Sequence, residues 1–564
     1  MTSPGRVRRL APRAAVIAVL GAALLLEHGE VFRAGSAQVV PLAPGGSESS
    51  LHPFRRADVT FEAWLAARNA RTLLRQPWRL FETPHCAPAT HTLTLGPPVV
   101  ALGVLGMPAA AVGREPLRVY NQARVAASAV CAVAMYALVT GWTRRRAAGL
   151  AAALLFAFHP IRQDLASHPP EWDIAWTALA LWFAQRLFEE GRWRDAAGLA
   201  LCVGLQIAAS FYALLAAALL SLPLVTWLVV HRAARRVSAT QLAVVAACAA
   251  IAAALLLGPY LAARRAGAIG GRTLAFYAPW RDYAPGGRLF PGAAVASAAL
   301  LGLAVPRRVA LPGLASDPRP ALAGAAIWVA FVAAGSTSAA SLQQWGLPVP
   351  DFDPYALLAR VLPGLDSVRD VTLLSTAVYL VSCVLAGAGF AAAIDGAGRW
   401  GSAASVAFVA LAAFVCFGFG PKPWLLVEAR PSQASIEFFE KLGRLGNDGP
   451  LLELPLDSVQ GAATLVDAQR TLLSAWHGRR TSACFASFPA PGHERLEALV
   501  PALPDRDAVD ALARLGFTTV IAHHPPGLDP GLDQQFAPGT SGSDPALRLV
   551  ARSDAMSAYA LVPR

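Results

Sequence analysis

The chain has 564 residues, of which 55% are hydrophobic and only 15% are charged, and its mean hydropathy is +0.46. This composition excludes an ordinary water-soluble globular protein and predicts an α-helical polytopic membrane protein. The formal net charge of +12 comes almost wholly from arginine, because Lys422 and Lys441 are the only lysines. The arginines stand mostly at the ends of apolar runs, so membrane topology explains the charge and we expect no nucleic-acid partner.

The N-terminus joins a basic segment to an apolar run, "RVRRLAPRAAVIAVLGAALLLEHGE" at residues 6–30. This pattern is typical either of a cleaved signal peptide or of an uncleaved first transmembrane helix. Because many apolar runs follow, we favour an uncleaved helix whose N-terminus lies in the cytoplasm. The other predicted spans are 118–140, 147–160, 171–188, 195–212, 213–230, 239–258, 291–305, 320–336, 371–393 and 402–420, which makes about 11 with the first.

Residues 92–112 are also apolar, but Pro97, Pro98 and Pro108 interrupt them. We therefore expect this segment to lie in the outer interface and not to span the membrane. Leaving it out places the arginine-bearing breaks at 144–146, 192–194, 232–236 and 307–308 all on the N-terminal side. The sequence thus predicts an odd number of spans and an external C-terminus. The alanine-rich, lysine-poor residue usage indicates a bacterial protein, and hence the inner membrane.

The first external segment, residues 27–117, carries the first candidate site. Asp58 and Glu62 are four residues apart, so they share one face of the helix predicted over 58–75. Asp58 has two interpretations: a cap that accepts a backbone N–H at the start of this helix, or a catalytic base or metal ligand in a partly dehydrated cavity. Glu62 is the second candidate for the same catalytic role.

The same helix is rich in arginine and aromatic side chains, which indicates an interfacial amphipathic helix. Arg68 is placed to meet a phosphate, and Trp64 and Trp78 are expected to anchor at the lipid headgroups. The preceding run "LAPGGSESS", residues 42–50, predicts a flexible connector.

The second external segment, 161–170 within "FHPIRQDLASHPPEWDIAW", concentrates ionisable residues at the edge of a span. Such residues are costly near a membrane unless they are paired or functional. Asp164 and His168 are therefore candidate catalytic residues. Together with other carboxylates they are able to hold a hard divalent cation such as Mg²⁺ or Mn²⁺, although the spacing matches no defined metal motif. The simpler interpretation is an ion pair of Arg162 with Asp164 or Asp173.

The third and fourth external segments, 259–290 and 337–370, supply arginine and aromatic residues. Guanidinium groups suit phosphates and aromatic faces suit sugar rings. The candidate substrate-binding residues here are Arg272, Trp280, Arg281 and Arg369. Interfacial anchoring explains the composition of the third segment equally well. In the fourth segment, the alternative is an ion pair of Arg369 with Asp366 or Asp370.

The tail, residues 421–564, has the texture of a soluble protein and predicts one small extracytoplasmic α/β domain. Its predicted elements are helices near 432–445 and 505–515, strands at 450–456 and 517–523, and a hairpin near 547–552 and 557–562. His477 and His523 are interpreted as satisfied surface histidines and not as a site. Cys86 and Cys484 both fall in predicted external segments and are able to pair in an oxidising compartment.

Taken together, the arrangement resembles that of the GT-C type membrane glycosyltransferases, with a long first external loop, a multispan bundle over residues 1–420 and an external C-terminal domain. The residues that carry the resemblance are "DVTFEAWLAARNARTLL", "PLRVYNQARV", "RRRAAGLAAALLFAFHPIRQ", "ALLARVLPGLDSVRD" and "PLLELPL". The resemblance implies transfer of a sugar from a polyprenyl-phosphate donor to an external acceptor. It also implies that Asp58 matches the acidic residue of the first loop, although other members carry an adjacent acidic pair where this chain has a single Asp.

Such a transfer needs a base for the acceptor proton, which Asp58 would supply, and cations that steady the phosphate leaving group. Arg272 or Arg281 and Arg369 would be those cations, in contact with a membrane-held lipid donor.

Two other classes of protein fit the sequence less closely. One is a non-catalytic relative that acts in envelope assembly or lipid-linked glycan handling, in which Asp58 is only a cap. The other is a transporter, for which charges near the span centres are expected.

Overall fold

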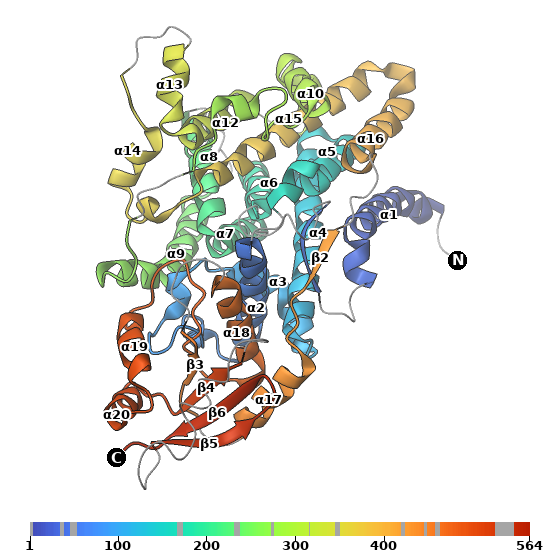
Figure 1. Cartoon of the computed structure of the whole chain (residues 1–564). Helices are drawn as coiled ribbons and strands as arrows, with labels where there is room; N and C mark the ends of the chain where they lie inside the picture. The colour runs from blue at the N-terminus through green and yellow to red at the C-terminus, as the bar shows by residue number, and fades with distance from the viewer. Residues whose placement is uncertain are drawn as a thin grey trace.

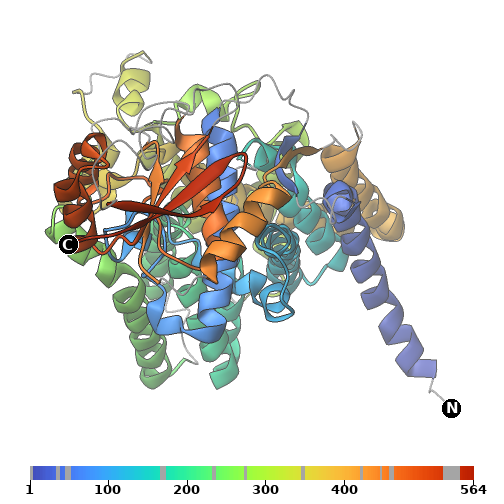
Figure 2. The ribbon, with the colours of Figure 1, turned by 60° about the horizontal axis from the view of Figure 1, so that its bottom comes forward.

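The computed structural model describes residues 4–33, 39–44, 53–165, 173–230, 237–271, 276–314, 316–344, 350–418, 424–444, 448–456, 463–524 and 546–564. Helices dominate, and Figure 1 shows most of them gathered in a bundle above a smaller unit that contains strands β3 to β6. The N-terminal end lies beside the bundle and the C-terminal end lies in the smaller unit, as Figures 1 and 2 both show.

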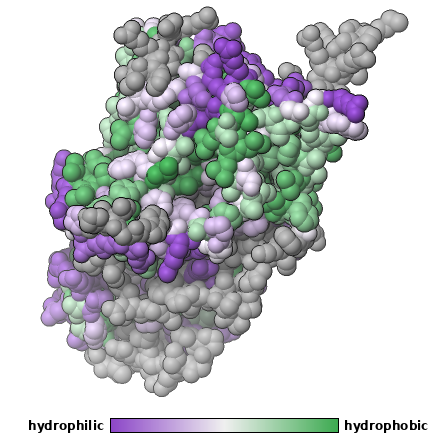
Figure 3. Space-filling view, turned by 90° about the horizontal axis from the view of Figure 1, so that it is seen from above, coloured by the Kyte–Doolittle hydropathy of each residue, from purple (hydrophilic) through white to green (hydrophobic). Residues whose placement is uncertain are grey.

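Five helices among the described residues are long and apolar enough to cross a membrane. They are α1 (Pro4–Arg33, apolar over Ala14–Phe32), α4 (Pro116–Thr143), α9 (Ala239–Arg265), the run Val371–Gly396 that ends in α15 (Ser375–Gly396), and the run Gly398–Phe417 that ends in α16 (Gly401–Phe417). Large apolar side chains on α9 and α16 point outward. Figure 3 shows broad apolar areas on the face that it draws, as expected of a surface covered by lipid. The chain is a polytopic membrane protein, as its composition predicts.

The other six predicted spans also fall on helices. These are α5 (Arg146–Phe158), α6 (Ala175–Glu190), α7 (Trp193–Ala209), α8 (Phe211–Val230), α10 (Ala293–Ala304) and α12 (Arg319–Ala334). None of them passes the same length and composition test alone within the described residues. The helix α12 passes it only together with α13 (Thr337–Gln344), at a bend of 105°, so the total of 11 spans stays a prediction. Shorter helices lie between them: α11 (Arg307–Ala310), α13 (Thr337–Gln344) and α14 (Pro354–Val361).

The arginine-bearing breaks between these helices contact one another. Arg145, just before α5, forms an ion pair with Asp395 near the end of α15. The backbone N–H of Gly313 donates to the Trp142 carbonyl at 2.8 Å. The Gln241 amide at the start of α9 donates to the Gly191 carbonyl after α6, also at 2.8 Å. Breaks that the charge pattern assigns to one side of the membrane are therefore neighbours in the structure.

The helix α2 (Pro53–Arg75) is buried, which corrects the expectation of an interfacial helix. It packs against α3 (Val100–Ala111) and α4, and α18 (Ala463–His477) covers it from the tail. Trp64 is 1% exposed and so lies in the protein core instead of at lipid headgroups, whereas Trp78, beyond the helix end, is 77% exposed. The small side chains around α2 explain the close packing, because they let neighbouring helices approach: Ala57, Ala63, Ala66, Ala67 and Ala70.

The position of Asp58 on α2 is a second correction. The helix begins at Pro53, five residues before Asp58. Asp58 therefore lies in the second turn, where it cannot cap the helix start.

The apolar segment that the sequence excluded from the spans forms α3, which is 12 residues long. A helix of that length cannot span a bilayer that needs about 20 residues, in agreement with the prediction.

The tail contains a sheet whose strand order, in the described residues, is β3-β4-β6-β5. β3 (Leu451–Leu454) is parallel to β4 (Thr519–His523), whereas β6 (Met556–Leu561) is antiparallel to β4 and to β5 (Leu547–Arg552). The helices α17 (Gln433–Gly443), α19 (His493–Leu499) and α20 (Arg506–Arg514) accompany it. The predicted strands, hairpin and two helices are confirmed, but α18 and α19 have no counterpart in the sequence-based prediction.

The tail and the first loop are joined by backbone pairing and by a disulfide. β1 (Val39–Pro44) pairs antiparallel with β2 (Trp424–Glu428), so residues 42–44 of the expected flexible connector belong to a strand. Cys86 and Cys484 form a disulfide, as their external placement allows. Short 3₁₀ turns complete the described chain: η3 (Pro77–Arg79), η4 (Thr92–Leu95), η5 (Pro160–Leu165), η7 (Trp280–Tyr283), η8 (Leu365–Ser367), η9 (Val371–Leu374), η10 (Gly398–Trp400) and η11 (Val500–Ala502).

Candidate functional site

α2 and the first turns of α4 run side by side in opposite directions. The Arg71 guanidinium, near the end of α2, donates to the Arg114 carbonyl just before α4 at 3.0 Å. Glu62, earlier on α2, lies close enough to Tyr120 inside α4 to act on it electrostatically. Asp58 is half-buried and lies one turn before Glu62, about 6 Å further along the α2 axis. Because the two helices are antiparallel, Asp58 is expected to lie closer to the middle of α4 than Glu62 does.

Glu62 of α2 lies beside a group of buried polar side chains on α4. Its side chain is 4% exposed, and Tyr120 and Arg124 are buried with it. The Arg124 guanidinium lies 5.7 Å from the centre of the Tyr120 ring. One turn further, a ring nitrogen of His28 on α1 is 3.0 Å from the Ser128 hydroxyl. Glu62 and Arg124 both act electrostatically on Tyr120, so a buried carboxylate and a buried guanidinium lie near the same hydroxyl group.

The second loop brings Arg162 and Asp173 together with electrostatic contact, as the simpler interpretation of that loop predicts. The Arg162 guanidinium donates to the Phe156 carbonyl at 3.0 Å and also lies beside the Cys131 thiol of α4. Asp173 is 5% exposed and accepts a hydrogen bond from the Trp176 indole at 3.1 Å. The second loop therefore places the Arg162 guanidinium and the Asp173 carboxylate, each held by a hydrogen bond, next to α4.

The Asp173 turn is held by an amide network from α7. The Gln206 amide donates to the Asp173 carbonyl at 3.0 Å. Its oxygen accepts from the Thr177 backbone N–H at 3.0 Å and from the Thr177 hydroxyl at 2.8 Å. Asp164 lies in η5, at a position whose side chain is outside the described residues, and His168 is outside them altogether.

One face of α4 connects these groups. Tyr120, Arg124, Ser128 and Cys131 are spaced by four, four and three residues, so they lie along the same side of the helix. Arg124 and Cys131 are about 10 Å apart along the axis. We call this the α4 track: Tyr120, Arg124, Ser128 and Cys131 with the groups that meet them, His28, Glu62, Arg162 and Asp173. Asp58 lies one turn before Glu62 on the same helix, so we expect its side chain to face the same side of α4.

Arg68 is engaged by the backbone of its own loop. Its terminal nitrogens donate to the carbonyls of Arg79 at 2.8 Å and Glu82 at 2.6 Å, and also to the Leu80 carbonyl. Burial, and then the neighbouring Arg79 charge, lower the pKa of Arg68 to about 10, so it stays protonated at neutral pH. In this structure Arg68 holds the turn after α2.

The third and fourth external loops are joined to each other. The Phe276 N–H donates to the Arg369 carbonyl at 2.8 Å, and the Val371 N–H donates to the Phe276 carbonyl at 2.9 Å. Trp280 is the first residue of η7 and is half-buried, whereas Arg281 and Arg369 are exposed. Arg272 lies outside the described residues. The structure therefore places two of the predicted phosphate-binding arginines on connected loops.

The ion pair expected as the alternative for Arg369 does not form, because its two proposed partners are engaged elsewhere. Asp366 accepts from the Arg264 guanidinium of α9 at 2.6 Å. Asp370 accepts from the Thr372 N–H at 3.1 Å and so caps η9. The end of α9 also meets the first loop, where the Tyr260 hydroxyl donates to the carbonyls of Leu93 at 3.1 Å and Gly96 at 3.0 Å. α9 thereby ties the first loop to the fourth.

The tail histidines are inside the domain, which corrects the expectation of surface residues. His477 is buried, and its ring nitrogen accepts from the Arg479 N–H at 3.1 Å. His523 is largely buried and lies 2.8 Å from a carboxylate oxygen of Glu453, itself fully enclosed. The Thr481 hydroxyl donates to the other oxygen of Glu453. These contacts tie β3, β4 and the segment after α18 together.

Among the described residues, no group of three His, Cys, Asp or Glu side chains is arranged to hold a metal ion. The residues that the sequence-based prediction missed are Arg124 and the Gln206 network. Arg124 had a readable signal, because an arginine six residues inside the predicted span 118–140 is costly unless it has a function or a partner. Gln206 had none, because its role depends on the contact of α7 with the start of α6.

No protein family matches the chain by sequence, and no curated protein does. Its structure is similar to that of the arabinofuranosyltransferase AftD from Mycobacteria, with 15% sequence identity, a TM-score of 0.52, and coverage of 98% of this chain and 40% of AftD. A structure of a mutant AftD gives 16% identity, a TM-score of 0.54, and coverage of 97% of this chain and 41% of that one.

The structure is less similar to that of the archaeal oligosaccharyltransferase AglB from Archaeoglobus fulgidus, which was solved with an inhibitory peptide and a dolichol-phosphate. The sequence identity is 14% and the TM-score is 0.40, and the match covers 91% of this chain and 70% of AglB. The likeness to AftD shows that this chain has the GT-C fold of membrane glycosyltransferases. This chain spans about two fifths of the length of AftD.

Proposed function

We propose that this protein is a membrane glycosyltransferase that moves a sugar from a polyprenyl-phosphate donor to an acceptor outside the cytoplasm. The GT-C fold supports the reaction class. The feature that supports the proposal is the position of Asp58, a half-buried carboxylate one turn from Glu62 on the face of α2 that meets α4. An isolated cap would need no such surroundings.

In this mechanism Asp58 acts as the general base. The acceptor hydroxyl gives its proton to the Asp58 carboxylate while its oxygen forms a bond to the anomeric carbon of the donor sugar. The bond between that carbon and the phosphate oxygen breaks, and the polyprenyl phosphate leaves with the electron pair. Buried surroundings favour this chemistry, because fixed charges act more strongly where water is excluded.

The arginines of the connected loops are proposed to hold the phosphate. Arg281 and Arg369 are exposed, and the backbone bonds between their loops keep the two segments together. Guanidinium groups bind phosphate oxygens in a bidentate manner, which suits a lipid-linked phosphate at the membrane surface. Trp280 would contribute a ring face for the sugar, and Arg272 is proposed as a further phosphate ligand.

Other members of the α4 track position these groups. Glu62 and Arg124 both act electrostatically on Tyr120, and Arg162 acts on Asp173 about two helical turns away. Glu62, Asp164 and His168 stay secondary candidates for proton transfer. Asp173 joins them as a carboxylate fixed by Trp176. A divalent cation, Mg²⁺ or Mn²⁺, is an open requirement that addition of a chelator to the purified enzyme would test.

The proposed topology places the N-terminus in the cytoplasm of a bacterial cell and the tail outside the inner membrane. The Cys86–Cys484 disulfide supports an oxidising environment for the first loop and the tail. A reporter that is active only outside the cytoplasm, fused after Arg564, should give a signal, and a cysteine introduced at Arg145 should be labelled only from the cytoplasmic side. Signals on the opposite sides would reject this topology.

The test of the function is a deletion strain whose lipid-linked and envelope glycans are profiled by mass spectrometry. We expect the deletion to accumulate a polyprenyl-phosphate sugar and to lack one sugar on an envelope glycan, lipid or protein acceptor. The mass difference would name the sugar class. If the deletion leaves every glycan unchanged, a non-catalytic role in envelope assembly or lipid-linked glycan handling replaces the proposal.

A further inference from the structure

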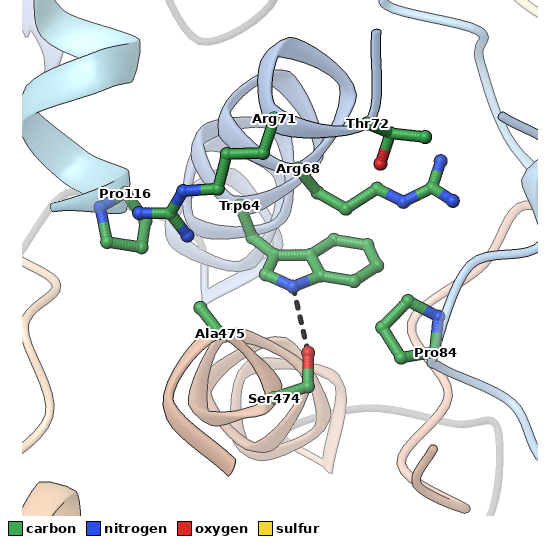
Figure 4. A pocket seen from close by; sticks show the side chains of 8 residues that line it. All are labelled: Trp64, Arg68, Arg71, Thr72, Pro84, Pro116, Ser474 and Ala475. Atoms are coloured by element: carbon green, nitrogen blue, oxygen red, sulfur yellow. Dashed lines mark hydrogen bonds between the residues drawn. The ribbon is translucent and has the colours of Figure 1, made fainter. Parts of the chain in front are cut away.

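A cavity lies between α2 of the first loop and α18 of the tail. It has a volume of about 110 Å³ and is open to the surface. Figure 4 shows Trp64, Arg68, Arg71 and Thr72 of α2 on one side and Ser474 and Ala475 of α18 on the other. Pro84 and Pro116 form its ends. Because the tail closes this space over α2, the cavity exists only where the two units meet.

The lining of the cavity donates hydrogen bonds and carries positive charge. It contains two arginines and two hydroxyl groups, and no Asp or Glu. Arg71 uses one terminal nitrogen on the Arg114 carbonyl at 3.0 Å, which fixes its guanidinium in place. The Ser474 hydroxyl accepts from the Trp64 indole at 2.9 Å and keeps its own proton to donate. Such a lining selects a ligand with hydrogen-bond acceptors and negative charge.

The acids near the cavity do not neutralise it. Glu115 acts on Arg71 electrostatically, but its carboxylate is also 3.5 Å from Arg430 of the tail. Glu82 acts on Arg68 electrostatically, and its carboxylate is paired with Arg79 at 2.9 Å. The Arg68 charge stays in the wall even though its nitrogens are bound to carbonyls. The side chains that line the space therefore carry two positive charges and no negative charge.

The size of the cavity limits what it can hold. A cavity needs about 10–15 Å³ of such volume to hold one water molecule, so the space admits several waters. A carboxylate or a phosphate with the edge of the sugar ring that bears it is of this order. The proline and indole walls are apolar and suit the carbon side of such a ring.

The distance from Asp58 decides which part of a substrate this is. Trp64 and Thr72 lie six and fourteen residues beyond Asp58 on the same helix, or about 9 and 21 Å along its axis. This is too far for the sugar that reacts. It is suitable for a sugar further along an acceptor chain that extends over α2.

We propose that the cavity is an acceptor subsite that binds an anionic sugar, one that carries a carboxylate or a phosphate, through Arg71, Thr72 and Ser474. The assignment of the bound sugar to an acceptor rests on the proposed glycosyltransferase function, whereas the binding of an anionic sugar does not depend on it. The subsite would give the enzyme a preference for charged glycans and would make the tail a part of substrate recognition.

The test measures binding to the full-length protein in nanodiscs of zwitterionic lipid by isothermal titration calorimetry, without any donor. The probes are D-glucuronate and D-glucose 6-phosphate, with D-glucose as the neutral sugar and inorganic phosphate as the bare anion. The variants are Arg71→Gln, which removes the charge at nearly constant size, and Thr72→Val, which removes the hydroxyl at constant shape. Arg75→Gln is the matched control, because Arg75 is exposed one turn on and does not line the cavity.

We expect at least one of the two anionic sugars to bind at least tenfold more tightly than glucose and than phosphate alone. The stronger of the two identifies carboxylate or phosphate as the charged group. Loss of a hydrogen bond to a charged group should weaken that binding about tenfold in Arg71→Gln, and Thr72→Val should weaken it several-fold. Arg75→Gln should bind within twofold of the wild type.

The proposal fails if neither anionic sugar binds better than glucose, if phosphate alone binds equally well, or if Arg75→Gln loses as much affinity as Arg71→Gln. Should Arg71→Gln fold poorly, Thr72→Val alone decides, because a valine there keeps the packing. These outcomes are distinct from failure of the proposed function. A protein that binds glucuronate but transfers no sugar would keep the subsite, whereas a transferase that acts on neutral glycans without this binding would lose it.

Discussion

The hydrogen bond between the Trp64 indole and the Ser474 hydroxyl joins α2 to α18, and its removal gives a quantitative test of this contact. Both side chains are buried and the two atoms are 2.9 Å apart. Ser474→Ala leaves the indole N–H buried without a partner, which costs about 1–3 kcal/mol. Trp64→Phe in the Ser474→Ala background removes the stranded N–H, so we expect the second substitution to cost less there than in the wild type. The difference defines a coupling energy between the two residues.

Hydrogen exchange of the α2 backbone amides, read by mass spectrometry, measures the opening of this contact. A loss of about 1–3 kcal/mol should speed exchange about 5- to 150-fold in the α2 amides that open when α18 separates. Amides of α16, remote from the contact, serve as the internal control and should be unchanged. Unchanged exchange in α2 of Ser474→Ala, or strictly additive effects of the two substitutions, would refute the claim that this bond fixes the tail on the helix that carries Asp58.

Three further outcomes are expected. Removing the Cys86–Cys484 disulfide should cost about 2–5 kcal/mol, so a reductant should lower the melting temperature of the wild type and leave that of the Cys86→Ser, Cys484→Ser double variant unchanged. Burial lowers the pKa of His85 to about 3 and that of His477 to about 4, against about 6.5 in an unfolded chain. The stabilisation should therefore be complete above about pH 6.5, and the free energy of unfolding should fall by about 1.4 kcal/mol per pH unit for each histidine toward pH 4. A flat melting temperature between pH 7 and pH 5 would contradict this. A methyl group on Gly389 of α15 would collide with the Ala298 carbonyl of α10, so Gly389→Ala should destabilise the bundle by about 1–3 kcal/mol, whereas Gly324→Ala on α12, where nothing lies within 4 Å, should be neutral or slightly stabilising in the same thermal unfolding assay.

Much of the membrane part could be predicted from the sequence, because runs of apolar residues report directly on burial in lipid or in a bundle. Each of the predicted spans falls on a helix, and the segment interrupted by Pro97, Pro98 and Pro108 forms a short helix that cannot span. The terminal hairpin and the strands of the tail also follow from local alternation. These features depend on neighbouring residues in the chain.

The environment of α2 could not be predicted in this way. A helix with arginines, Trp64 and many alanines looks the same in sequence whether lipid headgroups or a second domain cover it. The cover is α18, which begins about 400 residues later and meets α2 only in the folded protein. Asp58 stays a predicted site residue, chosen because it shares a helix face with Glu62 in the first external segment. Its start-of-helix interpretation is wrong, because the helix continues back to Pro53.

The partners of the candidate site depend on the same kind of long-range contact. Asp366 is taken by Arg264 and not by Arg369, and Asp173 is held by Gln206 from another helix. Local spacing favours neighbours in the chain, whereas tertiary packing decides between several arginines of equal charge. Arg124 shows the opposite case, because its place inside an apolar run was itself a signal of a buried partner.

The most direct test of the account compares three forms of the gene in a deletion strain, with matched amounts of protein in the membrane. The forms are the wild type, Asp58→Asn, and Asp507→Asn, whose side chain on α20 is 95% exposed and serves as the control for loss of a carboxylate. The account predicts that the wild type and Asp507→Asn restore the missing sugar in the mass-spectrometric glycan profile and that Asp58→Asn does not. Full restoration by Asp58→Asn would contradict its role as the base and would move catalysis to the carboxylates of the second loop.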